Sequence, residues 1–146
     1  MEPVAHLTSS EQTNRLLLRA RDAIDRDYER PLDIVALARI ALCSEAHFIR
    51  SFRRVFGETP HRYLQRRRVE RAMWLLRATD RSVSEICLDV GFTSFATFTR
   101  TFRDIVGETP SSFRANGRPV AEVPTCFEKA WSRPSSFGQA GPAGSP

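Results

Sequence analysis

The side chains with the clearest chemistry are arginines that recur at helical spacing in two short segments. Of the 22 basic residues only Lys129 is a lysine, so nearly all positive charge is carried by arginine. A planar guanidinium can bridge O6 and N7 of guanine with two hydrogen bonds, and it can also pair with phosphate. In both segments the outward positions follow an i, i+3, i+4, i+7 spacing, and they are Ala46, Ile49, Arg50 and Arg53 in the first and Ala96, Thr99, Arg100 and Arg103 in the second.

Residues for catalysis or metal binding are sparse. The only histidines are His6, His47 and His61, and none follows a known catalytic or metal-ligand spacing. The three cysteines form no CxxC pair, which excludes a cysteine zinc motif and a disulfide framework. We therefore expect no enzyme, no catalytic residue, no metal and no cofactor, with a redox switch at Cys126 as a minor alternative.

An internal repeat organises the chain. Residues 52–60 read FRRVFGETP and residues 102–110 read FRDIVGETP, an offset of fifty. Farther upstream the best offset is forty-nine, which pairs Ile34 with Val83 and places one added residue near Thr93. The repeated unit is therefore two helices joined by a variable turn.

Capping residues support the same division. Ser44 and Ser94 precede the second helix of each unit as N-caps, and Gly57 and Gly107 follow it as C-terminal stops. A GETP element then begins another helix, with Thr59 or Thr109 as the N-cap and proline at the first helical position. After Pro60 the helical pattern runs to Ala78 without a breaker.

These patterns predict an all-α fold of about seven helices, with two helix-turn-helix subdomains joined by a long linker helix. We expect a flexible N-terminus at 1–12, a DNA-binding domain at 13–116 and a mostly disordered Gly/Pro/Ser-rich tail at 117–146, in which only Val120 to Trp131 could dock back. Within the domain the expected segments are 32–57 for the first unit, 59–78 for the linker helix, 82–107 for the second unit and 109–116 for a final helix.

Charge differs between the two halves. Residues 44–78 hold nine arginines against three glutamates, a net of +6, whereas residues 79–116 hold four arginines against five carboxylates, a net of −1. Arg54 of the first copy is replaced by Asp104 in the second. We therefore expect unequal half-sites, with the first unit supplying most of the attraction to phosphate.

The linker helix adds a basic cluster of Arg66, Arg67, Arg68 and Arg71. Successive residues on a helix point about 100° apart, so these side chains cannot all face one way. We expect one or two of them, assigned to Arg66 and Arg67, to reach backbone phosphates and the others to serve as internal partners. The full set of expected backbone contacts is Ser44, His47, Arg53, Arg54, Arg66, Arg67, Ser94, Thr97 and Arg103.

The motifs above closely resemble the DNA-binding domain of AraC/XylS-type transcription regulators, over about residues 17–116. The run LDIVALARIALCSEAHFIRSFRRVFGETPHRYL, the RVERAMWLL of the linker and SVSEICLDVGFTSFATFTRTFRDIVGETPSSFR carry the likeness. The resemblance implies two recognition helices that bind adjacent major-groove segments on one face of DNA. Carried over by position, the base contacts are Ala46, Ile49 and Arg50 in the first unit and Phe95, Ala96, Thr99 and Arg100 in the second.

The chain departs from the family pattern at two kinds of position. Ala46 and Ala96 stand where many members have a larger or polar residue, so base preferences cannot be transferred. The usual glycine of the first turn is Leu42, which indicates either a turn without a left-handed residue or a turn that tolerates strain. Most members also carry an effector-binding domain, and without one in this sequence we expect a protein similar to the stand-alone activators of the family.

The resulting function is a sequence-specific regulator of transcription, an activator, that binds double-stranded DNA as a monomer and contacts RNA polymerase. No apolar run approaches the length of a membrane span, and residues 1–10 lack both a basic start and an apolar stretch, so we expect the bacterial cytoplasm and its nucleoid. One alternative is a DNA-binding module that needs a separate sensor or partner protein for specificity. Another is a basic helical module that binds RNA or an acidic protein. RNA recognition usually needs exposed aromatic residues for stacking, whereas most aromatic residues here occupy core positions, which disfavours this alternative.

Overall fold

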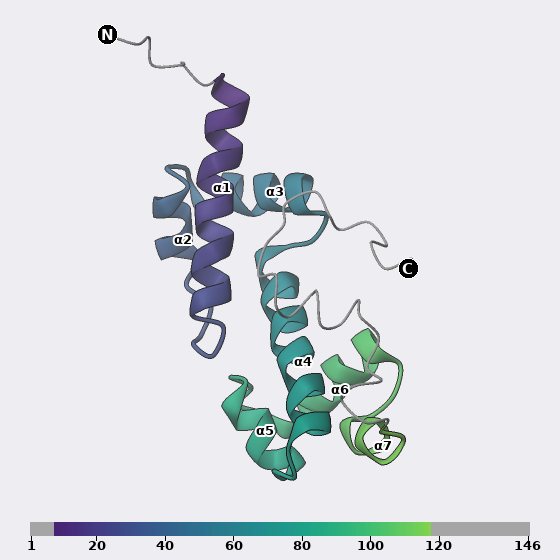
Figure 1. Cartoon of the computed structure of the whole chain (residues 1–146). Coiled ribbons are helices and arrows are strands. Elements are labelled where there is room, and N and C mark those ends of the chain that lie inside the picture. The colour runs from purple at the N-terminus through teal and green to yellow at the C-terminus, as the bar shows by residue number, and fades with distance from the viewer. Residues whose placement is uncertain (1–7, 118–146) are drawn as a thin grey trace, which may run out of the picture.

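The computed structural model describes residues 8–117, and in this range the chain is entirely helical (Figure 1). Seven helices follow one another without a strand between Thr8 and Gly117, which confirms the expected all-α fold. The helices are α1 (Ser9–Arg26), α2 (Ile34–Ile40), α3 (Glu45–Phe56), α4 (Pro60–Ala78), α5 (Val83–Asp89), α6 (Phe95–Val106) and α7 (Pro110–Ala115).

The repeat seen in the sequence appears as two cores of the same design. In the first unit Phe48 and Phe52 of α3 are fully buried against α1, α2 and the beginning of α4. In the second unit Phe98 and Phe102 of α6 are fully buried against α5, α7 and the rest of α4. Because side chains three and four residues apart share a helix face, these aromatic residues turn the opposite face of α3 and α6 toward solvent.

Helix α4 connects the two units. Among the helices of residues 8–117, it is the only one that packs substantially against members of both units. Figure 1 shows α4 with α3 near its beginning and α6 near its end. Helix α4 therefore forms the continuous link between the two units.

The capping residues expected from the sequence are all present. Ser44 and Ser94 accept the backbone N–H of His47 and Thr97 through their side chains. Gly57 and Gly107 end α3 and α6 in the left-handed conformation. Thr59 and Thr109 cap α4 and α7, each followed by proline at the first helical position.

Helix α1 begins earlier than the expected boundary after residue 12. Thr8 accepts the backbone N–H of Glu11, and the Glu11 carboxylate accepts the backbone N–H of Thr8 at 2.7 Å. This capping box satisfies two of the donors that a helix start leaves unpaired, so residues 9–12 belong to α1. The remainder of the expected flexible N-terminus, and the tail with Val120–Trp131 and Cys126, lie outside the described residues.

The turn between α2 and α3 contains a strained residue. Leu42 has a φ of 55° and exposes 77% of its surface. Its counterpart in the second unit is Gly91, with a φ of 102°. Both turns therefore contain a residue in the left-handed conformation. In the first unit this residue is a leucine, and its backbone strain lowers the stability by about 1–2 kcal/mol.

Candidate nucleic-acid interface

The outward faces of α3 and α6 carry the residues that the sequence assigns to base contact. Each face lies opposite a row of buried aromatic residues, so its orientation is determined by the core. Six of the seven candidates have exposed side chains, namely Ala46, Ile49, Arg50, Phe95, Ala96 and Arg100. Ile49 exposes 36% and Phe95 50% of its surface, so both apolar side chains are available for contact on these faces.

Thr99 differs from the other candidates. It is half-buried, and its Oγ1 atom is buried without a hydrogen-bond partner. Its counterpart in the first unit, Ile49, is more exposed. The second face therefore offers less side-chain surface at this position than the first.

Capped N-termini and arginines near the C-terminal ends of α3 and α6 flank the two faces. The Oγ atoms of Ser44 and Ser94 are used as cap acceptors, which leaves each hydroxyl proton able to donate to a phosphate. The positive end of each helix dipole favours an anion at the same place. His47 is exposed and Thr97 half-buried in these first turns, whereas Arg53, Arg54 and Arg103 are exposed in the last turns of α3 and α6, at the opposite ends of the two helices.

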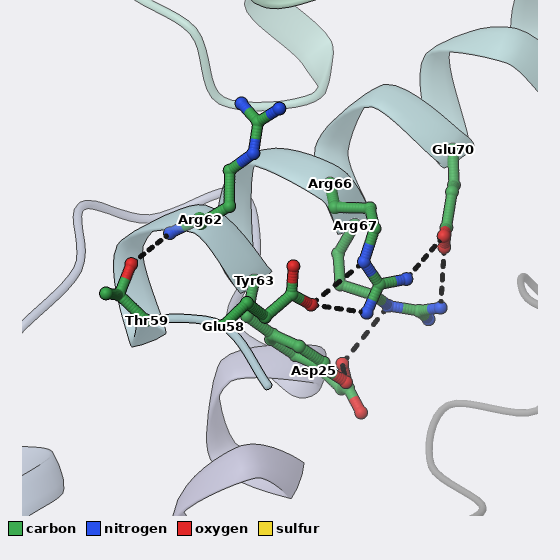
Figure 2. Close-up of polar contacts among 8 residues, drawn as sticks. All are labelled: Asp25, Glu58, Thr59, Arg62, Tyr63, Arg66, Arg67 and Glu70. Carbon is green, nitrogen blue, oxygen red and sulfur yellow. Dashed lines mark hydrogen bonds and ion pairs between the residues drawn. The ribbon is translucent and has the colours of Figure 1, made fainter. Parts of the chain in front are cut away.

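Two arginines expected at phosphates are instead engaged within the protein (Figure 2). Arg66 donates to Glu58 at 2.7 and 2.9 Å and to Glu70 at 2.6 Å. Arg67 pairs with Asp25 at 3.1 Å and with Glu70 at 3.0 Å. The side chain of Arg67 is only 7% exposed, against 36% for Arg66.

This cluster removes Arg66 and Arg67 from the candidate interface. A phosphate contact by Arg67 would require its guanidinium to leave two carboxylates inside the protein, where an unpaired charge is costly. Arg66 is more accessible, but both sides of its guanidinium are already occupied by carboxylates. The expectation for these two residues therefore has to be changed, because their charge is neutralised locally.

A tyrosine completes the buried cluster. Tyr63 donates its hydroxyl proton to Asp25 at 2.7 Å. Burial raises the pKa of Tyr63 far above its ordinary value, and the negative charge of Asp25 raises it further. Burial alone would lower the pKa of Arg66, but hydrogen bonds and charges from Glu58 and Glu70 raise it instead. Tyr63 therefore keeps its proton and Arg66 its charge, and the cluster joins α1 to α4 through Asp25.

The other two members of the basic cluster are Arg68 and Arg71, and Arg71 lies over the ring of Trp74, with its Cζ atom 4.6 Å from the ring centroid. Arg68 is 9% exposed and donates to the backbone carbonyls of Tyr28 and Arg30 at 2.7 and 2.8 Å. The guanidinium of Arg62 points away from the buried cluster in Figure 2. Sequence reasoning did not assign Arg62, although its place two residues after Pro60 already located it at the start of α4.

The two faces retain unequal charge after these corrections. Exposed cations on α3 are Arg50, Arg53 and Arg54. On α6 they are Arg100 and Arg103, beside the exposed carboxylate of Asp104. Among residues 8–117 no three His, Cys, Asp or Glu side chains form a metal-binding group, and no helix is long and apolar enough to cross a membrane.

Comparison with known sequences finds relatives of this chain among transcription regulators. A family model described as a helix-turn-helix domain matches residues 37–116. Regulatory protein SoxS of Escherichia coli K12 is 36% identical over 74 residues, which cover 51% of this chain and 69% of SoxS. A helix-turn-helix-type transcriptional regulator of Haemophilus influenzae is 41% identical over 63 residues, but the match spans only 21% of that longer relative and 43% of this chain.

Solved structures give the same result for the fold. The DNA-binding domain of AdpA, a global transcriptional factor crystallised with a target DNA, matches with a TM-score of 0.63 and 28% identity, over 82% of this chain and 97% of that one. A probable AraC family transcriptional regulator from Rhodopseudomonas palustris matches with a TM-score of 0.66 and 29% identity, over 72% of this chain and 99% of that one.

Proposed function

Since this chain belongs to the AraC-type helix-turn-helix family of DNA-binding transcription regulators, we propose that it reads two successive major-groove segments of double-stranded DNA with α3 and α6. The observation that carries the proposal is the pair of exposed, arginine-bearing helix faces opposite two equivalent aromatic cores. A helix fits the major groove, where each base pair presents a distinct pattern of donors and acceptors. The structure of AdpA with its target DNA supports the same class of partner.

In this proposal Arg50 and Arg100 read bases, each by a bidentate contact to guanine. The small or apolar side chains beside them contact base edges and thymine methyl groups, and these are Ala46, Ile49, Phe95, Ala96 and Thr99. The backbone contacts come from Ser44, His47, Arg53, Arg54, Ser94, Thr97 and Arg103, with Arg62 added and with Arg66 and Arg67 removed.

The regulatory role goes beyond the family assignment. Two reading heads in one chain allow a monomer to occupy two groove segments, so we assign a monomeric activator that contacts RNA polymerase from its DNA site. A cytoplasmic protein bound to the nucleoid follows from that role. The alternative is a module that becomes specific only with a separate sensor protein.

Selection from a random duplex library at near-physiological salt tests the proposal, because specific binding survives there better than nonspecific binding to phosphate. We expect a motif of two unequal blocks centred about 10–11 bp apart. The Arg50→Ala, Arg100→Ala double variant should lose the motif, whereas Arg19→Ala, an exposed arginine of α1, should retain it. Recovery of motif-free, salt-sensitive DNA would contradict intrinsic specificity, and recovery of the motif only with a cell extract would favour the sensor-dependent alternative.

A further inference from the structure

The connection between α1 and α2 touches the second unit, although it belongs to the first. Arg68 of α4 donates to the carbonyl oxygens of Tyr28 and Arg30 in this connection, at 2.7 and 2.8 Å. The Cζ atom of the same guanidinium lies 5.5 Å from the centroid of the Phe92 ring, in the turn between α5 and α6. One buried side chain therefore bonds the backbone of the first unit and stacks on an aromatic ring of the second.

Gly91 shows how closely the two units approach. A Cβ atom at this position would lie 2.8 Å from the carbonyl oxygen of Glu29 and 3.0 Å from Nε of Arg68. Both distances are shorter than an ordinary van der Waals contact. The α1–α2 connection is thus seated directly on the turn of the second unit, and a side chain at Gly91 would push the two apart.

Tyr28 extends this contact into both cores. It is the one residue that packs against the core cluster of the first unit and also against that of the second, within the part of the chain that the structure describes. The contact between the units therefore has an apolar component beside the polar one supplied by Arg68.

The position of Arg68 along α4 is equally informative. Tyr63 and Leu64 belong to the core of the first unit, whereas the buried residues of 69–76 belong to the core of the second. Arg68 lies at the boundary between these two halves of the helix. A bend or twist of α4 at this boundary would rotate one unit relative to the other, and among the core contacts it would disturb those of Tyr28, which packs against both clusters.

We propose that Arg68, with Gly91 and Phe92, forms a clamp that sets the distance and rotation between α3 and α6, and so determines the half-site spacing that the protein accepts. Arg68 is then a positioning residue for DNA recognition, since its buried guanidinium contacts protein. The inference rests on the proposed function. Two linked reading heads gain avidity only when their geometry matches the site, and one added base pair rotates the second half-site by roughly 34° and moves it by about 3.4 Å.

Parallel selections with the full chain and its variants test the clamp. The library is random duplex DNA, and the readout is the distribution of separations between the two recovered blocks. We expect a single separation for the unmodified chain and two or three adjacent separations for Arg68→Met, with unchanged block sequences. In binding titrations, one extra base pair should weaken the unmodified chain about tenfold or more, but Arg68→Met only about threefold.

Two further variants keep the test decisive. Arg77→Met is the matched control, because Arg77 of the same helix stacks on Phe113 within the second unit, and its spacing should stay single. Arg68→Lys keeps the charge and its hydrogen-bond donors but lacks the planar group that stacks on Phe92, so it should broaden the spacing less than Arg68→Met and serves if the latter does not fold.

The outcomes separate the two claims. If both Arg68 variants select well-defined blocks at the single separation found for the unmodified chain, the clamp is overturned and the proposed function stands. An equal loss of affinity at every spacing would also overturn it, because it indicates a purely structural role. Absence of a two-block motif for the unmodified chain would overturn the proposed function and the clamp with it.

Discussion

Individual residues decide how specific and how stable the two faces are. Arg50 and Arg100 occupy equivalent positions on α3 and α6, and both are exposed. Their neighbourhoods differ, because Arg53 and Arg54 follow Arg50 whereas Arg103 and Asp104 follow Arg100. Equivalent side chains are therefore expected to contribute unequally to binding.

Replacing each of these arginines in turn tests the inequality. We expect Arg50→Ala to weaken binding to the selected site by about 2–3 kcal/mol and Arg100→Ala by about 1 kcal/mol, within the range of one bidentate base contact. Fluorescence anisotropy titrations on one duplex at fixed salt provide the measurement. Equal losses would show that the two half-sites are read equally.

Leu42 is a second residue with a measurable effect. Its φ of 55° places a branched side chain in the left-handed region, and 77% of the residue is exposed. Leu42→Gly should therefore raise the free energy of unfolding by about 0.5–1 kcal/mol, the relieved strain minus the larger entropy of glycine in the unfolded chain.

Urea unfolding followed by circular dichroism measures this change. Gly107→Ala is the matched control, because it puts a side chain at a φ of 95° with open space around it, and it should lower the stability. A destabilised Leu42→Gly variant would mean that the leucine side chain contributes more through packing than its backbone costs.

At the scale of the element, α4 carries many arginines and also connects the two units. Its sequence alone does not show which of these arginines face solvent and which bond within the protein. Its arginines resemble a basic face, but Arg66, Arg67 and Arg68 bond to Asp25, Glu58, Glu70 and two backbone carbonyls. The helix thus bonds to α1 and to the connection between α1 and α2 through polar contacts that are mostly shielded from water. Shielded contacts of this kind position elements more firmly than exposed ion pairs do.

Two neighbouring arginines distinguish the shielded contacts from the exposed ones. Arg67→Met should lower the free energy of unfolding by about 3 kcal/mol, because it leaves the buried carboxylate of Asp25 without its cation. Arg66→Met should cost about 1 kcal/mol or less, since its side chain is 36% exposed. Urea unfolding of both variants checks the difference.

The Arg66→Met and Arg67→Met variants also test whether these two arginines lie outside the DNA interface. With the fraction of folded protein held near one, both variants should bind the selected duplex with affinities close to that of the unmodified chain. A loss of affinity in folded Arg67→Met would return this residue to the DNA contacts.

For the whole molecule, the distribution of exposed charge sets the response to salt. Only cations that replace counterions at phosphates contribute to the slope of log K against log salt, by about 0.9 each. Buried or paired arginines contribute nothing to it, although they count fully in the net charge of +5. The slope is therefore a measure of how many arginines reach the DNA.

Arg54→Ala should reduce the magnitude of this slope by about 0.9. Arg54 is exposed on α3, and Asp104 stands at its position on α6. Arg19→Ala, on α1, is the matched control and should leave the slope unchanged. Binding titrations at four or five salt concentrations check both, and an unchanged slope for Arg54→Ala would place that residue away from phosphate.

Much of the architecture follows from the sequence alone. The repeat, the aromatic stripes at Phe48, Phe52, Phe98 and Phe102, and the serine, threonine, proline and glycine caps are local signals, because helix periodicity and capping depend on residues only a few positions apart. They were sufficient to predict the helices, the two units and the outward faces of α3 and α6.

The tertiary structure decided which charges are available. Arg68 bonds a carbonyl 40 residues away, and Tyr63 bonds a carboxylate 38 residues away. Such partners are brought together only when α1 packs against α4, and no local pattern records that contact. Apart from the start of α1, the sequence therefore determined where the helices begin, end and face, whereas packing determined which arginines stay at the surface and which hold the two units together.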